Sequence, residues 1–155
     1  MLLLYITSWY WAWMEYRLAF SLANVNDPKE RLNRAIQVLT EEVKEDRTFQ
    51  YINEIKLNRI VTAESSKAYF TKQVDQENKE GVFAGYKALV AQVSNIILEI
   101  NPDFPYSHML ASTMIEGSHH QRFFAEHLPS LTDVEEGKDL IPDFYKKLVF
   151  KTIEI

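Results

Sequence analysis

The sequence predicts an all-α fold, built as an antiparallel bundle of about six helices. Glycine is scarce, the five prolines punctuate the chain, and apolar residues recur at intervals of three and four. No stretch shows the alternation of apolar and polar residues that is typical of a strand. A chain of 155 residues is long enough to bury one substantial core, so we expect a single domain over residues 1–155.

The first predicted helix, from Leu3 to Ala23, is the most aromatic part of the chain. It holds seven of the twenty aromatic residues, including all three tryptophans. Its apolar residues form two stripes, which are Leu2, Ile6, Trp9, Trp13, Tyr16 and Phe20, and Leu4, Trp11, Leu18 and Leu22. We therefore expect this helix to be buried on nearly all sides.

The apolar start of this helix fits neither a membrane span nor a signal peptide. Glu15 interrupts the run after fourteen residues, whereas a spanning helix needs about 20. No basic residue precedes Arg17, whereas a signal peptide begins with a basic region. We expect a cytoplasmic protein that has no membrane partner.

The second predicted helix has the clearest start in the sequence. Asp27 is expected to cap it, with proline at the first helical position and Glu30 completing a capping box. This helix is predicted from Pro28 to Glu45. A third helix is predicted from Thr48 to Gln76 and a fourth from Lys79 to Ile100, because apolar residues keep a helical spacing in both.

Proline and aspartate set the limits of the last two predicted helices. The segment from Asn101 to Pro105 stops the fourth helix, because a proline disfavours helical geometry in the residue before it. A fifth helix follows from Pro105 to His127. After a loop, Asp139 is expected to cap a sixth helix that ends near Thr152.

Composition limits the partners and the chemistry. The chain has 22 acidic and 17 basic residues and a formal charge of −5, which disfavours direct binding of nucleic acid. The absence of cysteine excludes thiolate catalysis, Cys-zinc sites and iron–sulfur clusters, and fits a reducing compartment. There is no Gly-rich phosphate loop and no nucleophile elbow. We therefore expect a protein that is not an enzyme and binds no cofactor.

The aromatic residues of the first helix favour a binding site for an apolar or aromatic small molecule. Aromatic walls offer a large contact area, and Trp and Tyr keep one polar atom that can orient a ligand. The predicted ligand-binding residues come from the first and fourth helices and are Trp9, Trp13, Tyr16, Phe20, Phe83 and Tyr86. The alternative is that these rings form a solid core.

The histidines of the fifth helix raise a second hypothesis, a metal-dependent helical-bundle enzyme. Glu116 and His119 have the Glu-x-x-His spacing of di-iron bundles, and His120 lies one turn from Glu116. A di-iron site needs a second such pair, and the sequence has none. His127 is two turns from His120, which is too far for one ion. We therefore predict no metal ligands and keep this hypothesis as an alternative.

The fifth helix carries more apolar surface than one core face needs, which favours a homodimer. Gly117 in mid-helix costs about 1 kcal/mol relative to Ala, so we expect another interaction to offset this cost. The last two helices would pair with their symmetry mates as a four-helix bundle. The predicted interface residues are Ser112, Ile115, His119, Phe123, Phe144 and Leu148. The alternative is that the fifth helix is central within one chain.

Three stretches resemble the C-terminal ligand-binding and dimerisation domain of tetracycline-repressor (TetR) family regulators. Residues 5–11, Tyr-Ile-Thr-Ser-Trp-Tyr-Trp, look like the helix that leaves the DNA-binding domain. Residues 26–32, Asn-Asp-Pro-Lys-Glu-Arg-Leu, resemble the frequent Asp-Pro-x-Glu-Arg-Leu start of the next helix. Residues 109–117 resemble a helix of the dimer interface that ends in Glu-Gly or Asp-Gly.

The resemblance implies an effector-sensing domain in transcription regulation. Its pocket would lie among the first four helices, and its last two long helices would form the dimer. The family binds DNA through an N-terminal helix-turn-helix, and this chain contains none, so DNA is expected as a partner only through such a segment upstream. A structural dimeric helical protein without a ligand remains a further alternative.

Overall fold

The computed structural model describes residues 2–43, 56, 60, 64 and 69–154. These residues confirm the all-α prediction, since they form helices and no β-strand. The α-helices are α1 (Leu2–Leu22), α2 (Pro28–Thr40), α4 (Val74–Lys79), α5 (Ala84–Ile100), α6 (Ser107–His127) and α7 (Leu140–Ile153), with a 3-10 turn η1 at Pro129–Leu131. Across the described ranges, no helix is both long enough and apolar enough to cross a bilayer.

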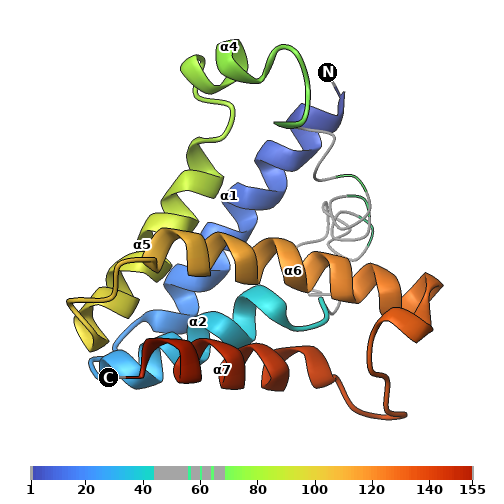
Figure 1. Ribbon diagram of the computed structural model, residues 1–155. Helices are drawn as coiled ribbons and strands as arrows, with labels where there is room; N and C mark the ends of the chain where they lie inside the picture. The colour runs from blue at the N-terminus through green and yellow to red at the C-terminus, as the bar shows by residue number, and fades with distance from the viewer. Residues whose placement is uncertain (1, 44–55, 57–59, 61–63, 65–68, 155) are drawn as a thin grey trace.

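The helices surround α2, which contacts α1, α5, α6 and α7 (Figure 1). α1 and α5 run side by side, and α6 crosses them. α2 and α7 lie alongside each other below α6 in this view. The short α4 stands apart at the far end of α5.

The core is built on one face of α1 rather than on its whole circumference. The buried residues of that face recur every three or four positions and are Thr7, Tyr10, Trp11, Met14 and Leu18. Tyr5, Trp9, Tyr16 and Phe20 lie on the outer side, with between 46% and 76% of their surface exposed. The prediction that this helix is buried on nearly all sides was therefore wrong, because α2, α5 and α6 cover only part of it.

α2 begins where the sequence predicts and ends earlier. The Asp27 carboxylate accepts a hydrogen bond from the Glu30 backbone N–H at 3.1 Å, and Pro28 takes the first helical position. The helix stops at Thr40 instead of Glu45, because the backbone becomes extended at Glu41.

Between residue 69 and Ala84, the described structure departs from the predicted helix limits. Most of the helix predicted from Thr48 to Gln76 lies outside the described residues. Its last part is not continuous, because residues 70–73 form a bend and a turn before α4. The fourth helix begins at Ala84 instead of Lys79, since the backbone turns at Gly81 with a φ of +81° that favours glycine.

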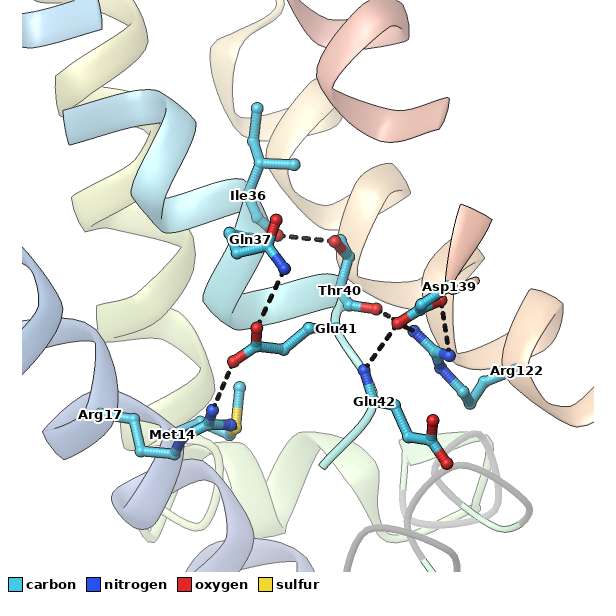
Figure 2. Close-up of polar contacts among 9 residues, drawn as sticks. All are labelled: Met14, Arg17, Ile36, Gln37, Thr40, Glu41, Glu42, Arg122 and Asp139. Carbon is cyan, nitrogen blue, oxygen red and sulfur yellow. Dashed lines mark hydrogen bonds and ion pairs between the residues drawn. The ribbon is translucent and has the colours of Figure 1, made fainter. Parts of the chain in front are cut away.

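Asp139 starts the last helix as predicted and also ties three segments together (Figure 2). It accepts a hydrogen bond from the Ile141 backbone N–H at 3.4 Å, which caps α7. It also accepts one from the Glu42 backbone N–H at 3.0 Å and two from the Arg122 guanidinium at 2.9 Å each. Arg122 further donates to the carbonyl of Thr40, so that the last turn of α2 is joined to α6 and α7.

Candidate functional site

Two adjoining surface hollows of about 510 Å³ each lie along α5 and share the side chains of Phe83, Tyr86 and Lys87. We call them together the aromatic groove. Its remaining lining residues come from α5, from α6 and from the segment around α4, and they are Val90, Ala91, His108, Ser112, Glu116, Tyr69, Phe70, Val74, Asp75 and Asn78. This size suits a small organic ligand.

Tyr86 connects the groove to the core. Its ring stacks on that of Trp11, with centroids 4.0 Å apart and planes 17° apart. Trp11 is buried, and Gly85 lets α5 approach α1 closely, because a Cβ there would lie 3.2 Å from the Trp11 Cβ. The ring of Tyr86 is therefore backed by a buried indole, which fixes its orientation.

Glu116 lines the groove and interacts with its tyrosines. The Tyr86 hydroxyl donates to its carboxylate at 2.5 Å. Burial raises the pKa of Tyr86 and of Tyr69 above the ordinary value, and a hydrogen bond to Glu116 and its negative charge raise both further. Both phenols therefore stay protonated and can donate. None of the ion pairs among the described residues involves Glu116.

His119 lies one turn further along α6 and faces the interior. Its Nε2 is 3.2 Å from the Tyr10 hydroxyl, and its buried Nδ1 has no hydrogen-bond partner among the described residues. Burial lowers the pKa of His119 to about 4, against the opposing charge of Glu116, so the ring is neutral near pH 7. A small cavity of about 10 Å³ adjoins it, lined also by Thr40, Ser118 and Arg122, with space for about one water molecule.

The six ligand-binding residues predicted from the sequence do not form one site in the structure. Phe83 and Tyr86 line the groove. Trp13 is half-buried beside Tyr10, with the Arg17 guanidinium 5.0 Å from its ring centre. The other three, Trp9, Tyr16 and Phe20, lie on the outer side of α1 and do not line it.

Sequence reasoning did not place Tyr69, Lys87 or Glu116 in the predicted ligand-binding set, although all three line the groove. One signal for the groove was visible. Phe83, Tyr86 and Val90 share a helical face, and so do His108, Ser112 and Glu116 on the next helix. What the sequence did not show is that these two faces meet.

The six predicted dimer residues also lie in different environments in the structure. Ile115 and His119 are buried in the core of the chain, so they cannot face a partner. The buried face of α6 consists of Ala111, Met114, Ile115, Ser118 and His119, together with Ser107 at its start. Ser112 lines the groove and Phe123 is half-buried, whereas Phe144 and Leu148 are exposed on α7.

The histidines do not assemble into a metal centre in the described part of the chain. No group of three His, Asp or Glu side chains there is close enough to hold an ion. His119 is turned toward Tyr10, whereas His120 is exposed and lies near the ring of Phe124. The geometry therefore gives no support to the hypothesis of a metal-dependent enzyme at Glu116, His119 and His120.

Comparison with known proteins finds no family model, no curated protein and no solved structure that matches this chain. The likeness to TetR regulators therefore rests on the three sequence stretches alone.

Proposed function

We propose that this chain is an effector-sensing and dimerisation domain of a TetR-like transcription regulator, and not an enzyme. Its ligand, an apolar or aromatic small molecule, would bind in the aromatic groove. The observation that carries this proposal is the arrangement of Tyr86, which lines the groove, stacks on buried Trp11 and donates to Glu116. A ligand in the groove thus touches a ring that belongs to the packing of three helices.

The proposed mechanism is a shift between two arrangements of α1 relative to α6. A ligand that packs on Tyr86 favours the arrangement in which the Trp11–Tyr86 stack and the hydrogen bond to Glu116 are both formed. It can shift the equilibrium only by its difference in affinity for the two arrangements. In a regulator, a change in the position of α1 would be transmitted to the DNA-binding segment that precedes it.

The dimerisation part of the proposal uses the exposed side of α7. Phe144 and Leu148 are one turn apart there, and Met109 is the most exposed large apolar residue of α6. Exposed large apolar side chains on the surface of a helix are typical of a subunit interface. A two-fold axis beside α7 would bring them against the same residues of a second copy.

Tryptophan fluorescence tests ligand binding. In a Trp9→Phe, Trp13→Phe variant, Trp11 is the single indole and reports on the ring of Tyr86. Titration with a panel of aromatic compounds should change its emission. Ser112→Phe should abolish the response by filling the groove, whereas Thr113→Phe, at the next and exposed position of α6, should not. An emission that no compound changes, or an equal response in both Phe variants, would contradict the proposal.

A further inference from the structure

We infer that the aromatic groove selects organic cations, and that the cationic group lies beside the Glu116 carboxylate. This inference rests on the proposed function, because it names the class of ligand that the same groove takes. It goes beyond that function by assigning a charge to the ligand and a role to Glu116.

The first argument is the unbalanced charge of Glu116. Its side chain is partly buried, and the described residues supply a hydrogen bond from the Tyr86 hydroxyl to it but no ion pair. A partly buried carboxylate attracts a cation more strongly than an exposed one does, because less water screens the two charges. A cationic ligand in the groove would add an ionic partner that the described residues do not provide.

The second argument is the chemistry of the walls. Four aromatic rings line the groove, those of Tyr69, Phe70, Phe83 and Tyr86. The face of an aromatic ring carries partial negative charge and attracts ammonium groups. The same rings provide apolar contact for the rest of the ligand. An organic ammonium ion combines both properties, whereas a hydrated metal ion has no apolar surface to place against the rings.

The other charged residues of the lining agree with this assignment. Besides Glu116, the groove contains Asp75 and Lys87, so that two carboxylates face one ammonium group. Lys87 forms no ion pair with either acid and is exposed. The chain as a whole has a net charge of −5, which also attracts cations.

Three probes of nearly identical shape test the inference. Phenyltrimethylammonium, tert-butylbenzene and benzenesulfonate each join a phenyl ring to a tetrahedral group that is positive, neutral or negative. Calorimetric titration of the wild-type protein should show at least tenfold tighter binding of the cation than of the neutral probe. Added salt should weaken binding of the cation and leave binding of the neutral probe unchanged.

Two matched variants test whether the preference for the cationic probe depends on Glu116. Glu116→Gln keeps the size of the side chain and should bring the affinities for the cationic and neutral probes within about twofold of each other. Glu126→Gln removes an exposed carboxylate from the same helix, outside the groove, and should retain the full preference. If Glu116→Gln does not fold, the salt dependence of the wild-type protein still decides the question.

Each of the other outcomes contradicts the inference, and each identifies which part of it is wrong. Equal affinity for the cationic and neutral probes, or a preference that persists in Glu116→Gln, rejects the role of Glu116 but leaves the proposed sensing function intact. Tightest binding of benzenesulfonate assigns selectivity to Lys87 instead. Binding of none of the three probes, together with an unresponsive Trp11, rejects both the inference and the proposed function.

Discussion

The phenol oxygen of Tyr145 occupies the place that a Cβ at Gly117 would need. This contact joins α6 to α7 within one chain and explains why glycine is found in the middle of a long helix. The sequence indicated only that something should offset the cost of this glycine, and the structure places a side chain of the same chain against it.

Gly117→Ala should therefore destabilise the protein, although alanine favours a helix more than glycine by about 1 kcal/mol. Forcing a methyl group against the phenol costs about 1–3 kcal/mol, so we expect a net loss of up to about 2 kcal/mol in the free energy of unfolding. In a Tyr145→Phe background the oxygen is gone, and the same change should be neutral or stabilising. Urea unfolding of the four proteins measures the coupling, and additive effects would contradict the contact.

Arg122 should contribute to stability more than an exposed arginine does. Its guanidinium bonds the Asp139 carboxylate twice and also the Thr40 carbonyl. Arg122→Ala should lower the free energy of unfolding by about 1–3 kcal/mol, because partly buried partners lose hydrogen bonds to a charged group. Arg34→Ala is the control, since its pair with Glu30 is exposed and worth about 0.3–0.5 kcal/mol. Equal losses in the two variants, measured in urea, would refute this account.

His119 should make the protein less stable in mild acid. Its pKa is about 4 in the folded protein and near 6.5 when unfolded, so the unfolded chain binds more protons between these values. Stability should therefore fall as pH drops from about 6.5 to 4, by about 3 kcal/mol from this residue, and the fall should level off below pH 4. His119→Gln should lose this part of the pH dependence. Unfolding curves of both proteins from pH 4 to 7 make the comparison, and parallel curves would contradict the burial of a neutral imidazole.

Sedimentation equilibrium tests the proposed dimer. The wild-type protein should have about twice the mass of the 18.2 kDa chain. Phe144→Glu combined with Leu148→Glu should give the monomer mass, because charges would be buried against their own copies. Phe20→Glu, on the exposed side of α1, should leave the dimer unchanged. A wild-type monomer would contradict the proposed dimer. Dissociation caused by the α1 change alone would show that the interface has been assigned to the wrong helix.

Features that depend on local chemistry could be predicted from the sequence. Asp27 and Asp139 mark helix starts because a cap needs only its own next residues. The outward side of α1 could not be predicted, because aromatic residues lie all around this helix and only its contacts decide that Tyr10 is buried and Trp9 is not. Tyr86 and Glu116 meet through the packing of α5 on α6, which helical spacing alone does not determine.

The position of a bound ligand tests the central claim most directly. For whichever aromatic probe changes the emission of Trp11, intermolecular nuclear Overhauser effects should connect its protons to the rings of Phe83 and Tyr86. Contacts only with Trp9, Tyr16 and Phe20 on the outer side of α1 would place the ligand elsewhere and contradict the account.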